Sequence, residues 1–316
     1  MKLYECDEIE INITDNIPVE KILETYSFPW NYNGRTSYIP LDEYHVVRIA
    51  PSKNKISARL YTLNPNYCLG DLSEKVIDIL RLKQSFEEFY SLAIKDPLLR
   101  DFAIKYRGWR PRKTSLWWGL VISICQQNTS FLQGWKMLAN IQRLYGKYVK
   151  IENEYTILPP SPKDILENPD KLALARVGYR KETIVNVAKY FAKNKHFIKK
   201  LPPEDLCKEL LKIKGIGKYS ARLALVLSTD YYKLPPIDRW LQKIIVEVYN
   251  VDTKRAEEFY KDYWGKWAGI AALATTIALD AVPISKALQR IKKGILVPAI
   301  ENKPTPANMW KFKDYW

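Results

Sequence analysis

The chain has 316 residues, of which 47% are hydrophobic and 27% charged, which is enough for a packed core and for one or two domains. Its 50 Lys and Arg against 35 Asp and Glu give a net charge of +15, which favours a polyanionic partner such as nucleic acid. No apolar run approaches the roughly 20 residues that span a membrane, and residues 1–16 are acidic where a signal peptide is basic. We therefore expect no membrane partner and a cytoplasmic or nucleoid location.

The cysteines and histidines do not form a metal-binding pattern. The four cysteines are scattered, at Cys6, Cys68, Cys125 and Cys207, and none belongs to a CxxC pair. The two histidines, His45 and His196, are far apart in the chain. We therefore expect neither a metal site nor another cofactor.

The first 84 residues are predicted to form an N-terminal antiparallel β domain. Residues 44–49 and 56–63 alternate or run apolar, and the turn-forming segment 51–54 separates them. This pattern is typical of a β-hairpin.

From Ser85 to the end of the chain the pattern becomes helical, in segments punctuated by proline. One apolar helix is expected over residues 116–125, and a further helix over 239–249. The aromatic side chains of the tail, Trp310, Phe312 and Trp316, are expected to pack on the core. The fold class is therefore α+β, with an N-terminal sheet (1–84) and a mostly helical core (85–316).

Residues 204–238 contain the most informative motif. Gly215 and Gly217 form a turn between two helical runs within 204–227, where glycine lets backbone N–H groups approach an anion. The loop 228–238 then leads to Asp238, which lies 21 positions after Gly217 and opens the next helix. Taken alone, the turn could be an ordinary loop and Asp238 an ordinary helix N-cap.

Together, the order and spacing resemble the helix-hairpin-helix DNA glycosylase superfamily with its Gly/Pro-rich loop and aspartate. This superfamily includes endonuclease III, 8-oxoguanine DNA glycosylase and 3-methyladenine DNA glycosylase II. Further segments resemble the same core, namely 96–99, 105–110, 124–130, 177–180 and 264–269. No cysteine follows Cys207, so the iron–sulfur cluster of some relatives of endonuclease III is not expected. The N-terminal sheet is similar in kind to the extra β domain of the other two branches.

The resemblance implies a role for the aspartate and for the hairpin. Asp238 would stabilise the oxocarbenium-like sugar formed as the N-glycosidic bond breaks, and would orient the attacking water. The hairpin would bind a DNA phosphate, with Arg222 nearby. Its phosphate-binding residues would be Lys214, Gly215, Ile216, Gly217 and Lys218.

Tyr219 decides between two reaction types. Bifunctional relatives place a lysine two positions after the second hairpin glycine and form a Schiff base with the sugar. Tyr219 stands there, and Lys218 is one residue early, a helical rotation of about 100°. The sequence therefore predicts a monofunctional enzyme, without lyase activity.

The base pocket is predicted from a few aromatic and small residues. Ala272 and Thr276 stand where the 8-oxoguanine enzyme has a base-reading glutamine and a stacking aromatic, which disfavours 8-oxoguanine. Tyr219, Trp117 and Trp118 are candidate stacking walls, with Trp30 and Tyr232 as further ones, and core packing is the alternative for each tryptophan and for Tyr232. Electron-poor alkylated purines gain most from such stacking.

An extruded base leaves a gap in the duplex that a side chain must fill. Asn128 matches the gap-filling asparagine of the 8-oxoguanine enzyme, and Gln127 matches the inserted glutamine of endonuclease III; we prefer Asn128, and a plain polar helix end is the alternative.

The sequence thus predicts a monomeric base-excision-repair enzyme that acts on double-stranded DNA containing a damaged base, most simply an alkylated purine such as 3-methyladenine. The alternatives are an 8-oxoguanine, hypoxanthine or uracil glycosylase, with or without lyase activity, and a non-catalytic helix-hairpin-helix DNA-binding protein.

Overall fold

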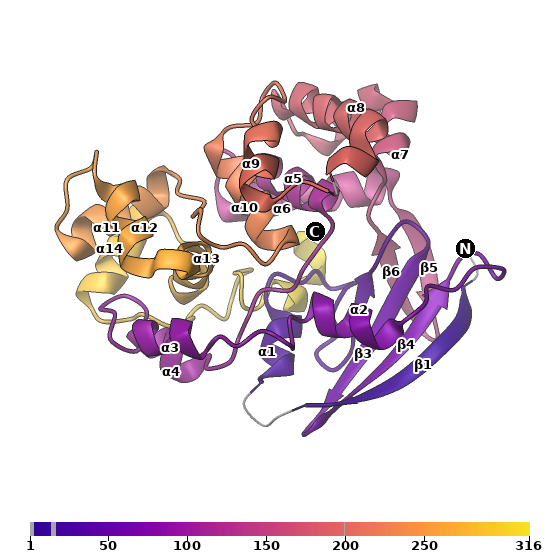
Figure 1. Cartoon of the computed structure of the whole chain (residues 1–316), viewed down its shortest axis with the longest axis horizontal. Coiled ribbons are helices and arrows are strands. Elements are labelled where there is room, and N and C mark those ends of the chain that lie inside the picture. Colours follow the sequence, from indigo (N-terminus) through magenta and orange to yellow (C-terminus); the bar gives the residue numbers. More distant parts are fainter. Residues whose placement is uncertain (1–2, 14–16, 199) are drawn as a thin grey trace.

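The computed structural model describes residues 3–13, 17–198 and 200–316. Its N-terminal part is a four-stranded antiparallel sheet in the order β1-β4-β3-β2 (Figure 1). The strands are β1 (Tyr4–Asn12), β2 (Ser37–Pro40), β3 (His45–Ser52) and β4 (Lys55–Thr62). The predicted hairpin is confirmed as β3 and β4, which pair from His45 with Thr62 to Ser52 with Lys55.

Two short helices, α1 (Val19–Glu24) and α2 (Leu72–Ile79), belong to the same N-terminal segment, so this part is not made of strands alone. A disulfide between Cys6 and Cys68 joins β1 to the loop that follows β4. This pairing was not predicted, and the two cysteines are 62 residues apart in the sequence.

The rest of the chain forms two helical lobes (Figure 1). The first contains α5 (Leu116–Cys125), α6 (Phe131–Tyr145), α7 (Pro162–Glu167), α8 (Arg180–Ile198), α9 (Pro203–Leu210) and α10 (Lys218–Ser228). The second contains α3 (Glu87–Ala93), α4 (Arg100–Lys105), α11 (Arg239–Tyr249), α12 (Ala256–Trp264), α13 (Ala268–Ala278) and α14 (Ile284–Lys292). Short 3-10 helices lie at Pro169–Ala175, Gly265–Trp267, Met309–Lys311 and Lys313–Tyr315. The predicted helices over 116–125 and 239–249 are confirmed as α5 and α11.

A second β-hairpin interrupts the predicted helical region. Strands β5 (Lys147–Ile151) and β6 (Glu154–Leu158) pair antiparallel and follow α6 directly. Their buried residues Val149, Ile151 and Leu158 pack against Val46 and Tyr61 of the N-terminal sheet. The expectation of helix almost everywhere after Ser85 was therefore wrong here, because these short strands depend on that sheet for their burial.

The hydrophobic cores also cross the predicted boundary near residue 84. One core joins residues of the N-terminal sheet to α3, α4, α11, α12 and α13. The other fills the lobe of α5 to α10 and includes Phe28 from the N-terminal segment, together with Met309 and Trp316 from the tail. Trp316 is buried and Trp310 packs edge-on against Tyr32, as predicted, whereas Phe312 is half-buried and its ring contacts Tyr315 of the tail itself. In the part of the chain that the structure describes, no helix is long and apolar enough to cross a membrane.

Candidate active site

A cavity of about 500 Å³ lies where the two helical lobes and the N-terminal segment meet. Its lining residues come from segments far apart in the chain, which the fold brings together. They include Thr25, Tyr26 and Phe28 from the N-terminal segment, Arg112, Trp118, Phe131 and Trp135 around α5 and α6, Tyr219, Leu223 and Leu227 from α10, Asp238 and Trp240 from α11, and Ala272 and Thr276 from α13.

Asp238 is the N-cap of α11, and its carboxylate accepts a hydrogen bond from the Leu241 N–H at 2.8 Å. Asp238 is therefore both a helix N-cap and a residue that lines the cavity. The residue is exposed, yet desolvation by the surrounding protein raises the pKa of its carboxyl, against backbone hydrogen bonds from Leu241 and Trp240 that lower it. A carboxylate that is accessible but poorly solvated is suited to interact with a positive charge that forms in the cavity.

Tyr219 is the second residue of α10 and lines the same cavity. Burial raises the pKa of its phenol, and the charge of Asp238 and the neighbouring Tyr26 raise it further. Tyr219 is therefore a neutral hydrogen-bond donor near Asp238 at any physiological pH.

Tyr26 extends the aromatic lining. Its ring stacks on Trp135 with the centroids 5.9 Å apart. Burial raises the pKa of its phenol, although a side-chain hydrogen bond with Thr276 lowers it. Because Thr276 lies on α13, this contact fixes the N-terminal segment against the second lobe at the cavity wall.

The structure places the predicted pocket residues in two groups. Tyr219, Trp118, Ala272 and Thr276 line the cavity. Trp117 does not, because its indole N–H donates to Pro160 O at 2.8 Å and its ring packs against Phe191 in the first lobe's core. This expectation is corrected for a physical reason, since successive residues of α5 point in different directions.

Two further aromatic candidates also lie outside the cavity lining. Trp30 stacks on Phe28 at 4.5 Å between centroids. Tyr232 accepts a hydrogen bond from buried Arg81 and donates one to Gln84 at 2.7 Å. Core packing, the alternative stated for these residues, therefore applies to Trp30 and Tyr232.

The glycine hairpin connects α9 to α10. Gly215 has φ +95°, and a Cβ there would lie 2.1 Å from the Thr183 Oγ1, so this position requires glycine. Gly217 has φ −102°, which any residue adopts, and a Cβ there would meet nothing within 4 Å. Of the two reasons for glycine at this position, an unusual backbone conformation and close approach to a phosphate, the first does not apply and the second stays a prediction.

Gly217 also leaves the start of α10 open. Its position is the N-cap, and no side chain caps this helix, whereas serines cap α5, α6 and α7. The first N–H groups of α10 are thus not capped by a side chain. Such N–H groups can bind an anion.

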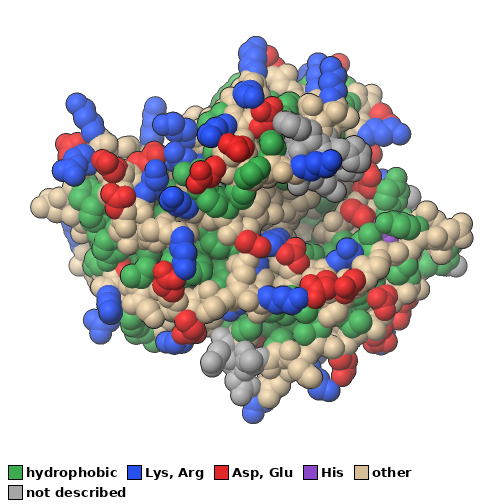
Figure 2. All heavy atoms as spheres, viewed as in Figure 1, with side chains coloured by type: hydrophobic (Ala, Val, Ile, Leu, Met, Phe, Trp, Pro, Cys, Tyr) green, Lys and Arg blue, Asp and Glu red, His purple; other side chains and the backbone are tan. Residues whose placement is uncertain are grey.

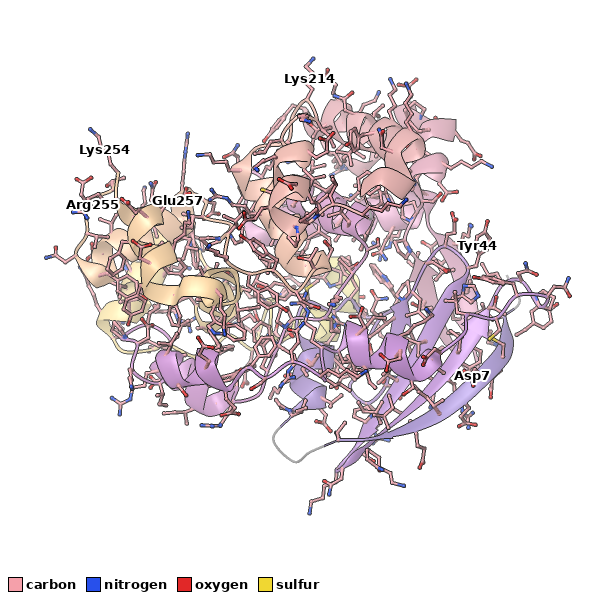
Figure 3. The ribbon with its side chains drawn as sticks, viewed as in Figure 1. Asp7, Tyr44, Lys214, Lys254, Arg255 and Glu257 are labelled. Atoms are coloured by element: carbon pink, nitrogen blue, oxygen red, sulfur yellow. A yellow bond between two sulfur atoms is a disulfide. The ribbon has the colours of Figure 1, made fainter. Side chains whose placement is uncertain are left out.

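The basic residues of the hairpin lie on the outside. Lys214 is exposed and forms an ion pair with Glu182 at 2.7 Å. Ile216, by contrast, is buried and packs into the hydrophobic core of the first lobe, which anchors the hairpin. Figure 3 shows Lys214 at the tip of the first lobe, and Lys254 and Arg255 at the tip of the second, all projecting from the same side of the molecule.

Lys218 lies on the side of α10 that faces α12. Burial acts to raise the pKa of the Glu257 carboxyl, but a hydrogen bond from Arg222 and the charges of Arg222 and Lys218 lower it overall. Arg222 and Glu257 form an ion pair at 2.8 Å. Lys218 is exposed and is not among the residues that line the cavity.

Charge is unevenly distributed over the face seen in Figure 2. Lys and Arg side chains project along the edge formed by the helical lobes, whereas Asp and Glu side chains are frequent over the N-terminal sheet. The helical lobes therefore offer the more favourable surface to a polyanion.

The polar end of α5 lies against the hairpin. The Gln127 side chain donates to Ser220 Oγ at 2.7 Å and to Gly215 O at 3.4 Å. Asn128 is exposed, has φ +46°, and makes no side-chain hydrogen bond within the described residues. Gln127 is thus engaged within the protein, while Asn128 is free to project.

Tyr26 and Arg112 are among the lining residues that the sequence did not predict. Tyr26 lies far in sequence from the helical motifs. Arg112 lies in a short basic segment that is indistinguishable by composition from a solvated loop. No local signal identified either residue, because both reach the cavity only through contacts between distant segments.

Among residues 3–13, 17–198 and 200–316, no group of three or more His, Cys, Asp and Glu side chains is arranged to hold a metal ion.

One lysine, Lys113, is among the residues that line the cavity. Its ammonium contacts Asp78 at 2.5 Å and Asp230 at 2.7 Å, so it is paired with two carboxylates.

The chain has the fold of the helix-hairpin-helix DNA glycosylases. Its features are two helical lobes, a glycine hairpin between α9 and α10, an aspartate at the start of α11 and an N-terminal antiparallel sheet. Comparison with solved structures confirms this fold prediction. No protein-family model and no sequence among the curated proteins matches the chain.

The 3-methyladenine DNA glycosylase from Archaeoglobus fulgidus is similar to this chain with a TM-score of 0.69 and 21% identity, over 92% of this chain and all of that one (100%). The Clostridium acetobutylicum 8-oxoguanine glycosylase/lyase, bound to double-stranded DNA with cytosine opposite 8-oxoG, gives a TM-score of 0.69 at 17% identity, over 92% and 98% of the two chains. Its apo-form gives 0.67 at 18% identity, over 86% and 96%. At these identities the likeness establishes the fold.

Proposed function

We propose that this protein is a DNA glycosylase that extrudes a damaged base from double-stranded DNA and hydrolyses its N-glycosidic bond. The observation that carries the proposal is the position of Asp238. It lines an aromatic cavity and follows the helix that starts at the glycine hairpin. The cavity, of about 500 Å³, is large enough to hold a nucleobase. A protein that only binds DNA has no need of a poorly solvated carboxylate in such a cavity.

In the proposed mechanism the hairpin holds a phosphate of the damaged strand while the base enters the cavity. As the glycosidic bond breaks, positive charge forms on the sugar, and Asp238 stabilises that charge more than it stabilises the uncharged ground state. The same carboxylate orients the water that attacks the sugar carbon. Asn128 fills the gap in the duplex, because Gln127 is already bonded to the hairpin.

We propose that the enzyme lacks lyase activity. Schiff-base formation requires an uncharged amine at the sugar. The cavity presents Tyr219 on α10, while Lys218 lies on another side of that helix and Lys113 is held by two carboxylates. A hydrolytic reaction that leaves the strand intact follows from this arrangement.

Two classes of damaged base have support. The aromatic side chains of Trp118, Tyr219 and Tyr26 favour a flat, electron-poor ring and thus alkylated purines such as 3-methyladenine, the class favoured by the sequence. Arg112 favours instead a base that carries a hydrogen-bond acceptor, such as 8-oxoguanine, hypoxanthine or uracil. The protein would act as a monomer on DNA in the cytoplasm or nucleoid.

The test is a panel of duplexes that each carry a single lesion. Base release is scored with and without alkali, which cleaves the strand at an abasic site. We expect release of at least one lesion, and product strands that stay whole until alkali is added. Binding of every duplex without release of any base would contradict the proposal and support a non-catalytic DNA-binding protein.

A further inference from the structure

Two basic side chains, Arg112 and Lys113, line the cavity without a part in the proposed reaction, and of these Lys113 is paired with Asp78 and Asp230 whereas Arg112 has no such partner among the described residues. Arg112 follows Pro111 in the segment between α4 and α5, and it lines the cavity. Protein surrounds the guanidinium, and this burial lowers its pKa to about 10, so it is still a cation at neutral pH. The residue nevertheless keeps some accessible surface and is among those that line the cavity.

The N-terminal segment fixes one edge of the guanidinium. Its Nη2 donates to Thr25 O at 3.0 Å and to Ser27 Oγ at 2.6 Å. These two residues flank Tyr26, which also lines the cavity. The position of Arg112 is therefore set by the same short segment that places the aromatic ring of Tyr26 at the cavity.

The remaining donors of Arg112 have no acceptor. A guanidinium has five N–H donors, and the two acceptors above account for those of Nη2. Within the described part of the chain, neither Nε nor Nη1 donates a hydrogen bond to the protein, and neither atom is sealed from solvent. No carboxylate of the described residues, Asp238 included, forms an ion pair with Arg112. The cavity thus holds a cation with unused donors and no anionic partner.

We propose that Arg112 is a specificity-determining residue that donates hydrogen bonds to a carbonyl oxygen of the extruded base, so that the pocket selects neutral oxo-bases over cationic N-alkylated purines. The inference rests on the proposed glycosylase function. It favours oxo-bases over alkylated purines, the two classes of base between which the aromatic lining alone does not decide.

Two physical effects act in the same direction. A buried donor gains most from a ligand that supplies an acceptor, and arginine is the side chain that most often reads the oxygen and N7 edge of guanine. A purine methylated at N3 or N7 carries a positive charge in the nucleotide, and the cation of Arg112 repels it in a poorly solvated cavity. A neutral base with an exocyclic oxygen gains the hydrogen bond and avoids the repulsion.

The experiment measures single-turnover release from full-length protein on duplexes that carry hypoxanthine, 8-oxoguanine or 7-methylguanine. Hypoxanthine and 7-methylguanine share the carbonyl oxygen at position 6 but differ in charge. Each rate is divided by the spontaneous rate of release of the same base, because the cationic nucleotide has the weaker bond. The variants are Arg112→Met, which removes charge and donors, and Arg112→Lys, which keeps the charge but not the planar fork.

We expect the wild type to favour at least one neutral oxo-base over 7-methylguanine. Arg112→Met should lower release of that oxo-base about 10- to 100-fold and leave release of 7-methylguanine equal or raised. Arg112→Lys should lower the oxo-base rate and keep the discrimination against the cation. A duplex with a tetrahydrofuran abasic site is the control, because it has no base for Arg112 to contact, and its affinity should not change.

Three results would overturn the inference. The first is a wild type that prefers 7-methylguanine after normalisation, and the second is an unchanged ratio of rates in Arg112→Met. The third covers the case in which Arg112→Met loses its fold, since Arg112 supports the turn at Thr25 and Ser27. In that case, unchanged rates for all three bases in folded Arg112→Lys would overturn it. Absence of release from every duplex by the wild type would instead contradict the proposed function itself.

Discussion

Asp238 and Tyr219 are electrostatic neighbours in one cavity, although they belong to different lobes of the protein. The charge of Asp238 adds to the effect of burial in raising the pKa of the Tyr219 phenol. The phenol therefore keeps its proton, and the carboxylate is the anionic member of the pair. This relationship supports the proposed role of Asp238 in charge stabilisation, with Tyr219 as a neutral part of the cavity wall.

Asp238→Asn should abolish most of the base release without harming the fold. Asparagine caps a helix as well as aspartate does, so the start of α11 should be kept. The variant lacks the charge that stabilises the transition state, and we expect release to fall on the order of 10²–10³-fold or more. Binding of lesion DNA, measured at a fixed salt concentration, should stay close to wild type. Release at the wild-type rate would show that Asp238 serves only as a cap.

The same variant should not lower the melting temperature at neutral pH. Burial raises the pKa of Asp238 in the folded state. The folded protein therefore binds a proton at this carboxyl more tightly than the unfolded chain does. The ionised carboxylate is therefore a cost to stability that appears as the pH rises above the ordinary pKa of aspartate. Thermal unfolding of both proteins at pH 7 should show equal or higher stability for Asp238→Asn, and that advantage should vanish in acid. A clear loss of stability at pH 7 would contradict the desolvation of this side chain.

The rate of base release should fall in acid at a higher pH than an ordinary aspartate would cause. In the proposed mechanism the ionised form of Asp238 is the active form, and its pKa is raised, so activity should be lost as the pH falls through that raised value. Single-turnover rates between pH 4 and pH 8, on a lesion without its own titration in that range, would check this. An acidic limb at or below about 3.9, the usual value for aspartate, would contradict it.

The parts of the site that could be predicted from the sequence are those built from contiguous residues. The helix limits of α5 and α11, the hairpin at Gly215 and the N-cap at Asp238 each follow from local signals. Turn glycines, helix periodicity and capping act over a few residues, so they can be read from one segment.

The parts that could not be predicted depend on contacts between distant segments. Ser27 and Arg112 are 85 residues apart, and their hydrogen bond fixes a cation in the cavity. Trp117 and Trp118 are adjacent in sequence, yet only Trp118 lines the cavity, because the packing of α5 decides which face is buried. From the sequence alone, both tryptophans were interpreted as candidate stacking walls of the base pocket.

The two hairpin glycines should respond differently to substitution by alanine. Gly217→Ala should fold normally, because φ is −102° and a Cβ would meet no atom within 4 Å. It should weaken binding to damaged and undamaged DNA alike, since a phosphate would approach this backbone closely. Fluorescence anisotropy with both duplexes at one salt concentration measures the effect, and unchanged affinity for both would show that the phosphate binds elsewhere.

Gly215→Ala is the matched control for that experiment. A Cβ at this position would lie 2.1 Å from Thr183 Oγ1, and φ is +95°, so the hairpin itself must move. We expect a loss of roughly 1–3 kcal/mol in the free energy of unfolding, measured by chemical denaturation. Stability equal to that of Gly217→Ala would contradict the observed hairpin conformation.

Borohydride should trap no covalent complex between the wild-type protein and lesion DNA. Trapping requires an amine that attacks the sugar, and Tyr219 occupies the cavity-facing position on α10. A trapped complex that persists in Lys218→Gln but is lost in Lys113→Gln would identify Lys113 as the amine. Loss in Lys218→Gln alone would mean that α10 turns to present Lys218 to the sugar, and the enzyme would then be bifunctional.

Asn128 should matter for duplex substrates and Gln127 for the stability of the hairpin. Asn128→Gly keeps the backbone conformation at φ +46° while it removes the side chain, so the fold should be unchanged. Release from a lesion in a matched duplex should slow about 10-fold or more, and release from the same lesion opposite a mismatched base should slow less, because that base costs less to extrude.

Gln127→Ala is the comparison for Asn128→Gly. It loses the hydrogen bond to Ser220 and should cost about 0.5–1.5 kcal/mol of folding stability. Its ratio of mismatched to matched release should stay near the wild-type ratio, because the side chain is held against the hairpin. The opposite pattern, a changed ratio in Gln127→Ala and a normal one in Asn128→Gly, would assign the gap-filling role to Gln127 and would require its side chain to leave Ser220 when DNA binds.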